Sequence, residues 1–220
     1  MPRSPRLEYP DALYHVTSRG SLRGAIFVDD QDRAALFAIL ARALQACEAR
    51  IFAYCLMGNH YHFVLQTRQA NLSTLMQRVN SIYSLRFKRR HGRLGPTFES
   101  RFKAVHVDRD SYLLAACRYV DLNPVRAGLV DSPAQWAWSS YRAHIGRTAC
   151  PSWLATVELH GALMGQVPED TVQTSTACRR YAEWVDAGRG VQLWKESLRH
   201  GIFLGDEAFV ERVKGQGQGQ

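Results

Sequence analysis

Two histidines separated by a single residue are the side chains in this sequence best suited to chemistry. His60 and His62 lie in an apolar run from Tyr54 to Gln66 that is typical of β-strand structure. Side chains alternate between the two faces of a strand, so both imidazoles are expected to point the same way. Neutral imidazole nitrogens can bind a divalent ion such as Mg²⁺, Mn²⁺ or Zn²⁺. The pattern predicts a metal site, although two partly exposed strand histidines would give the same spacing.

A tyrosine and an amide at helical spacing could complete that site. Asn123 follows Tyr119 by four residues, which places the phenol and the amide oxygen on one face if the helix continues through that turn. The amide is a candidate third ligand, and a metal with three protein ligands keeps open positions that can polarise a phosphate. Tyr119 is a candidate nucleophile for a phosphodiester, although a tyrosine at such a position is also a common core residue. Three other histidines, His15, His106 and His144, are expected to be structural.

The charge balance favours a polyanionic partner. The 220 residues include 28 Lys and Arg against 20 Asp and Glu, a net charge of +8 with a pI near 9.5. Arginine dominates the cations, and residues 86–93 form a strongly basic run. A guanidinium matches phosphate geometry better than an ammonium does, but a solvated helix end would also give this run.

The remaining composition favours a globular protein of the cytoplasm. A chain this long, with 46% hydrophobic residues, can bury a core and is expected to form one main domain with a smaller addition. The 5 cysteines form no CxxC pair, which argues against a disulfide framework or a zinc ribbon. Residues 1–10 lack the apolar core of a signal peptide, and no run is long enough to span a membrane, so we expect no membrane partner.

The elements that would position these side chains follow from hydrophobic periodicity and turn residues. Strands are expected at 12–19 and 101–108, helices at 31–49, 71–90 and 110–122, and a hairpin over 51–67 that turns at 57–59. The Asn123-Pro124 step should end the third helix. The order β-α-β-β-α-β-α predicts an α+β fold, with helices on one face of a small antiparallel sheet and the other face free to bind a partner.

The sequence divides into four regions. We expect a basic arm over 1–8, a catalytic domain over 9–145 and a helical C-terminal extension over 146–214. Residues 215–220 repeat glycine and glutamine and are expected to be disordered.

Several segments resemble one family. The HYH sequence of residues 60–62 resembles the HUH motif of single-tyrosine endonucleases, and RYVDLNPVRAGL at 118–129 resembles the tyrosine helix of IS200-like transposases. Residues 14–20, 26–33 and 95–103 support the match, which is closest to the REP-associated tyrosine transposases and covers roughly residues 9 to 145. A bare HxH is a weak signal, but four segments in order around it are specific.

The resemblance implies a ferredoxin-like or RRM-like HUH domain that cleaves single-stranded DNA near a hairpin through a 5'-phosphotyrosine intermediate. It implies Mg²⁺ or Mn²⁺ as cofactor, His60, His62 and Asn123 as ligands, and Tyr119 as the nucleophile. Many insertion-sequence members have glutamine where this chain has Asn123, which is one methylene shorter. The partner would be single-stranded hairpin DNA, bound by a monomer or a homodimer. Phosphate contacts are expected from a set of basic residues: Arg86, Lys88, Arg89, Arg90, Arg101 and Lys103.

An alternative function is a non-catalytic module that keeps the fold and binds hairpin DNA or RNA. The presence of His60, His62 and Tyr119 argues against it. A plain structural α+β protein would leave the basic charge and the ordered segments unexplained.

Overall fold

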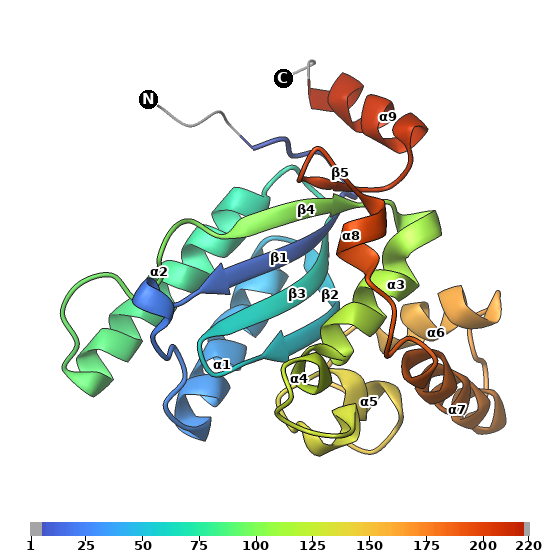
Figure 1. The fold of residues 1–220 in the computed structure, drawn as a ribbon, viewed down its shortest axis with the longest axis horizontal. Coiled ribbons are helices and arrows are strands. Elements are labelled where there is room, and N and C mark those ends of the chain that lie inside the picture. The colour runs from blue at the N-terminus through green and yellow to red at the C-terminus, as the bar shows by residue number, and fades with distance from the viewer. Residues whose placement is uncertain (1–5, 218–220) are drawn as a thin grey trace.

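A six-stranded sheet forms the centre of the protein (Figure 1). The structure is a computed structural model and describes residues 6–217. The strand order is β2-β3-β1-β4-β6-β5. The strands are β1 (Leu13–Arg19), β2 (Ala49–Leu56), β3 (His60–Thr67), β4 (Lys103–Val107), β5 (Leu198–Arg199) and β6 (Phe203–Leu204). Strands β1 to β4 pair antiparallel, as expected. Strand β6 runs parallel to β4, which corrects the expectation of a purely antiparallel sheet.

Three long helices lie within residues 30–121. In chain order the helical elements are η1 (Ser21–Arg23), α1 (Asp30–Ala46), α2 (Leu72–His91), α3 (Arg109–Asp121), α4 (Asn123–Arg126), η2 (Pro133–Gln135), α5 (Tyr141–His144), α6 (Thr156–Met164), α7 (Thr171–Asp186), α8 (Leu193–Ser197) and α9 (Glu207–Gly217). The predicted order of strands and long helices is confirmed, and the α+β class with it. In the part of the chain that the structure describes, no helix is both long enough and apolar enough to cross a membrane.

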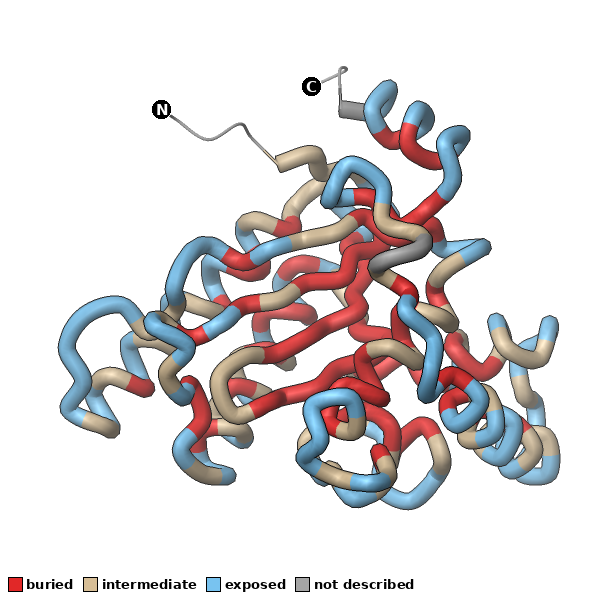
Figure 2. The backbone as a smooth tube through the Cα atoms, viewed as in Figure 1, coloured by how far each residue is buried: buried red, intermediate tan, exposed pale blue. Residues whose placement is uncertain are grey.

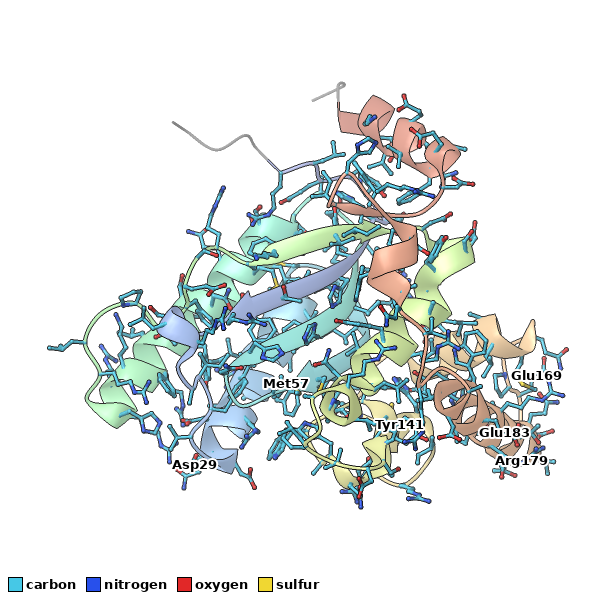
Figure 3. All side chains as sticks on the ribbon, viewed as in Figure 1. Asp29, Met57, Tyr141, Glu169, Arg179 and Glu183 are labelled. Carbon is cyan, nitrogen blue, oxygen red and sulfur yellow. The ribbon has the colours of Figure 1, made fainter. Side chains whose placement is uncertain are left out.

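Local chemistry explains where the elements begin and end. The side chain of Asp29 caps α1 by accepting hydrogen bonds from the backbone of Gln31 and Asp32. Gly92, with φ +60°, ends α2 in the left-handed conformation that glycine adopts without strain. The hairpin between β2 and β3 turns after Met57 (Figure 3). The amide of Met57 donates to the carbonyl of His60 at 2.9 Å.

Helices cover both faces of the sheet, which corrects the expectation that one face is free. Helices α1 and α2 lie behind the strands in Figure 1 and share a core with the Tyr14 side of β1. Helix α3 packs on the opposite face, where Leu113 and Val120 contact apolar strand residues such as Leu13 and Val64. Strands β2 and β3 are buried along most of their length (Figure 2), so both faces of the sheet are covered there.

The C-terminal extension contributes to the sheet as well as adding helices. Phe203 and Leu204 of β6 pair with His106 and Val107 of β4, so the extension is not purely helical. Helix α9 continues to Gly217, so residues 215–217 are helical rather than part of a disordered tail. The rest of the expected tail, 218–220, and residues 1–5 of the expected arm lie outside the described residues. The division of the chain near residue 145 stays a prediction.

Candidate active site

The two paired histidines lie side by side at the start of β3. His60 and His62 point to the same face, with ring centroids 5.0 Å apart. His62 is buried and His60 is half-buried. Opposite them on β1 stand Thr17, paired with His62, and Arg19, paired with His60. The alternation of strand side chains therefore puts both imidazoles where the sequence predicted.

Helix α3 brings the tyrosine and the amide to these histidines. The ring of Tyr119 meets His62 edge-on, with centroids 6.1 Å apart. Helix α3 ends at Asp121, and Asn123 is the first residue of the short helix α4. Asn123 is buried, and its side chain lies within hydrogen-bonding reach of His60. The structure thus gathers the four side chains into one site.

A third histidine, His15, belongs to the same cluster. His15 is buried on β1, and its Nε2 lies 2.9 Å from Nδ1 of His62. Its ring stacks on His62 and meets Tyr119 edge-on at 5.9 Å. We expected His15 to be structural, because only the register of β1 against β3 reveals that it faces the site.

The C-terminal extension also reaches the site, which the sequence did not indicate. Trp194 of α8 stacks on His15 with centroids 4.7 Å apart and contacts Tyr119 edge-on at 5.0 Å. Arg126 of α4 lies over the Tyr119 ring, with its Cζ 4.7 Å from the centroid, and donates to the carbonyl of Val191 at 2.7 Å. Tyr119 therefore lies between a guanidinium and an indole.

Burial keeps the clustered histidines neutral. It lowers the pKa of His15 to about 3 and the pKa of His62 to well below its usual range. The pKa of His60 is also lowered, chiefly by burial and further by the charge of Arg19, while the hydrogen bond with Asn123 acts in the opposite direction. Neutral imidazoles at ordinary pH are the form that binds metal.

The donor set suits one divalent cation. Among residues 6–217, no group of three or more His, Cys, Asp and Glu side chains could hold a metal. A site here would thus combine the nitrogens of His60 and His62 with the amide oxygen of Asn123. In both histidines Nδ1 already has a partner, which leaves Nε2 for a ligand. The residues present therefore fit a metal with open coordination positions.

Two adjoining cavities give access to the site. The larger, of about 820 Å³, reaches from His15, His62, Tyr119 and Trp194 to the start of β4. The smaller, of about 130 Å³, lies beside His60 and His62. Two of the predicted phosphate contacts, Arg101 and Lys103, are exposed and line both cavities.

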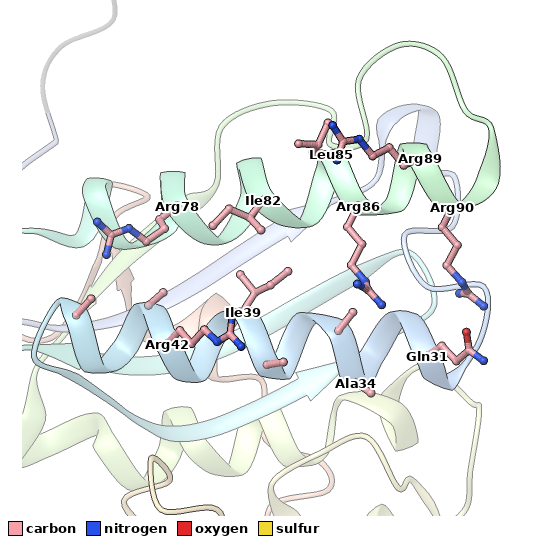
Figure 4. A pocket seen from close by; sticks show the side chains of 14 residues that line it. Gln31, Ala34, Ile39, Arg42, Arg78, Ile82, Leu85, Arg86, Arg89 and Arg90 are labelled. Atoms are coloured by element: carbon pink, nitrogen blue, oxygen red, sulfur yellow. The ribbon is translucent and has the colours of Figure 1, made fainter.

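The other predicted phosphate contacts lie on α2, away from the histidines. Arg86, Arg89 and Arg90 line a groove of about 1280 Å³ between α1 and α2, which we call the α1–α2 groove (Figure 4). Arg42 and Arg78 line it too, together with apolar side chains that include Ile82 and Leu85.

Two members of the predicted basic set have other neighbours. Arg90 makes ion pairs with Asp29 and Asp32 at 2.5 and 2.6 Å, so its charge is already shared with two carboxylates. Lys88 lies outside the groove, near Arg93 and the loop that follows α2. Arg86 and Arg89 thus remain the predicted residues in the groove for which the described part of the chain shows no ion pair.

Comparison with known proteins identifies the class. The sequence over residues 8–123 matches the model of a transposase family, so the fold and site described above belong to a transposase. The family is described as "Transposase IS200 like", and its model matches more than half of the chain. The chain therefore belongs to the IS200-like transposase family. No curated protein matches this sequence.

One solved structure shares this fold. A REP-associated tyrosine transposase bound to a REP hairpin is similar with a TM-score of 0.56 at 16% identity, over 70% of this chain and 92% of that one. A putative transposase from Deinococcus radiodurans R1 has a TM-score of 0.39 at 15% identity, over 58% of this chain and 97% of that one. The first likeness confirms the α+β architecture.

Proposed function

We propose that this chain is a metal-dependent endonuclease and strand transferase for single-stranded DNA, acting at hairpin-forming palindromic repeats through a 5'-phosphotyrosine intermediate. The convergence of His60, His62, Asn123 and Tyr119 in one accessible site carries this proposal. Membership of a transposase family supports the reaction class. The fold shared with a transposase that was solved on a REP hairpin supports the choice of substrate.

In the proposed reaction Tyr119 is the nucleophile. Its phenolic oxygen attacks the phosphorus of a phosphodiester and gives up its proton. A bond forms between that oxygen and the phosphorus, and the phenolic proton passes to solvent. The bond from the phosphorus to the 3' oxygen breaks, and the released 3' oxygen takes a proton from solvent and becomes a hydroxyl. The phosphotyrosine conserves the energy of the bond, so attack by another 3' hydroxyl reverses the step and completes strand transfer.

His60, His62 and Asn123 would hold a single Mg²⁺ or Mn²⁺. When bound, the ion would neutralise charge on the non-bridging oxygens of the scissile phosphate. Arg126 keeps its cation above the Tyr119 ring, where it favours the developing negative charge of the phenol during attack. Trp194 of α8 packs against the Tyr119 ring and limits the rotation of that ring.

Basic residues on two elements would hold the DNA. Arg101 and Lys103 lie next to the histidines and suit the phosphates of the cleaved strand. Arg86 and Arg89 of the α1–α2 groove, with Lys88 and Arg90 near it, suit the phosphates of the hairpin stem. The groove lies on the face opposite α3, so a substrate that reaches both must pass around an edge of the sheet.

A covalent adduct tests this function. Wild-type protein and the Tyr119→Phe variant would be incubated with Mn²⁺ or Mg²⁺ and internally labelled single-stranded hairpin DNA, then separated on a denaturing gel. The proposal predicts an adduct for wild type that requires metal and is lost in Tyr119→Phe. Tyr112→Phe, on the same helix, is the matched control and should keep the adduct. Salt-sensitive binding without any wild-type adduct would instead support the non-catalytic binding module.

A further inference from the structure

Both candidate ligand histidines have their Nδ1 atoms engaged by a neighbouring side chain. Nδ1 of His60 lies 2.7 Å from Oδ1 of Asn59, and Nδ1 of His62 lies 2.9 Å from Nε2 of His15. These two contacts come from different places, the β2–β3 turn and strand β1. In each ring a metal would therefore bind at Nε2, and at His60 it would take the place of the hydrogen bond with Asn123.

The contact to His60 fixes one tautomer. The amide nitrogen of Asn59 donates to the backbone carbonyl of Arg23 at 2.9 Å, which turns the amide oxygen toward His60. An amide oxygen can only accept a hydrogen bond, so Nδ1 of His60 must carry the hydrogen. The lone pair is then on Nε2, the nitrogen that a metal needs.

The contact to His62 can hold the same tautomer. His62 pairs with Thr17 in the register of β1 and β3, so His15 is its diagonal neighbour on the same face. The His15 ring is held by its contact with His62 and by stacking on Trp194. Its Nε2 can accept a hydrogen bond from Nδ1 of His62, which again leaves the lone pair on Nε2 of His62.

We propose that Asn59 and His15 are positioning residues that hold His60 and His62 with hydrogen on Nδ1, so that both Nε2 lone pairs are available to one divalent cation. The inference rests on the metal site of the proposed function and adds the residues that organise it. Partners of this kind fix ring orientation in metal sites, and their loss typically weakens metal affinity by about 10- to 100-fold.

The tautomers can be measured on the protein without metal. Long-range ¹H–¹⁵N correlation spectra of the wild-type protein should show a protonated Nδ1 and an unprotonated Nε2 for both His60 and His62. Asn59→Ala should lose this preference at His60 only, and His15→Phe at His62 only. A protonated Nε2 on either histidine in the wild-type protein would overturn the inference, whatever the protein does with DNA.

Mn²⁺ affinity provides the second readout, measured by electron paramagnetic resonance of the free ion. Asn59→Ala and His15→Phe should each weaken binding by about 10- to 100-fold. His15→Gln offers an amide oxygen as acceptor and should recover part of the loss, which a purely structural role for the ring would not predict. His106→Phe, at another buried strand histidine that stacks on Phe203, is the control and should bind Mn²⁺ as wild type does.

The wild-type measurement separates the two proposals. If wild type binds Mn²⁺ and both Asn59→Ala and His15→Phe bind it equally well, the positioning inference is wrong and the proposed function stands. If wild type binds no Mn²⁺ at all, the proposed metal site is wrong and the inference fails with it. The thermal unfolding midpoint of each variant would be compared with that of wild type to check that the variant is folded.

Discussion

Asn123 has a short side chain, yet its amide lies close to His60. Its side chain is one methylene shorter than glutamine, but helix α3 ends at Asp121 and Asn123 begins a new short helix. Leu122, between the two helices, keeps a right-handed helical backbone, and the buried amide of Asn123 approaches His60. The proposed asparagine ligand therefore lies close to His60 despite its shorter side chain.

This geometry predicts the behaviour of two substitutions at Asn123. Asn123→Ala removes the proposed oxygen ligand and should weaken Mn²⁺ binding by about tenfold or more. Asn123→Asp keeps an oxygen in place and should bind Mn²⁺ at least as tightly as wild type. Titration of each variant with Mn²⁺ decides the point. Unchanged affinity in Asn123→Ala would remove Asn123 from the ligand set.

The sequence predicted His60 with His62 and Tyr119 with Asn123 because the spacing within each pair is local, set by a strand and by a helix. The residues that surround them come from elsewhere in the chain. His15 reaches the site through the register of β1, and Trp194 arrives from the extension. Periodicity does not encode which strands pair or where a distant helix docks, so these two could not be predicted.

At the scale of single elements, helices α1 and α2 are joined by a buried carboxylate and its basic partners. Asp32 is buried near the start of α1, where it accepts from the Val28 amide and pairs with Arg90 and His91 at the end of α2. Burial alone would raise the pKa of Asp32, but these donors outweigh it and the pKa is lowered. The ionised carboxylate therefore stabilises the contact between the two helices.

Stability should depend on pH through Asp32. Because its folded pKa is lowered, its contribution is fully present above the unfolded pKa of about 4 and is lost as the pH falls through the folded value. Asp32→Asn should lower the unfolding free energy at neutral pH by about 1 to 3 kcal/mol and flatten the decline in acid. Urea unfolding from pH 7 down to pH 3 measures both. An acid decline as steep as in wild type would contradict the assignment.

Helix α2 also supports a prediction about DNA affinity. Replacing Arg86 and Arg89 by glutamine should weaken hairpin binding and reduce the slope of log affinity against log salt by about 1 for each phosphate that is no longer neutralised. Arg179→Gln, at the exposed Arg179–Glu183 pair on α7 (Figure 3), is the control and should leave the slope unchanged. Fluorescence anisotropy over a range of salt concentrations gives the slopes. Equal slopes for wild type and the double variant would place the stem elsewhere.

The strands and long helices could be predicted from the sequence because each has a clear period or cap. The cover over the second face was not predicted, although residues 51–57 and 63–65 are apolar at successive positions, which is typical of burial on both faces. The two-residue strands β5 and β6 could not be predicted, because they are too short to show any period.

For the whole molecule, the extension and the catalytic part are joined by shared buried contacts. Asp121, the last residue of α3, is fully buried. Its carboxylate accepts hydrogen bonds from the Ser140 hydroxyl at 2.7 Å and from the Tyr181 hydroxyl of α7 at 2.8 Å. Burial raises the pKa of Asp121 to about 7, and the two hydroxyl donors oppose that rise. The extension thus supplies one of the two hydroxyl groups that bind the buried carboxylate of Asp121.

Tyr181→Phe should therefore destabilise the whole protein. The change leaves buried Asp121 with one hydroxyl donor fewer, which should cost about 1 to 3 kcal/mol of unfolding free energy. Tyr112→Phe removes a hydroxyl from a half-buried position on α3 and is expected to stay within about 0.5 kcal/mol of wild type. Chemical denaturation of both variants measures the difference. Two separate unfolding transitions in wild type would show instead that the extension is an independent domain.

The most direct test of the central claim is to locate the covalent link. After reaction of wild-type protein with Mn²⁺ and hairpin DNA, the adduct would be digested with nuclease and protease and its peptides mapped by mass spectrometry. We predict a nucleotide attached through phosphate to Tyr119, in the peptide that carries α3. A nucleotide on any other residue, or a cleaved strand with no attached peptide, would contradict the claim that Tyr119 is the nucleophile.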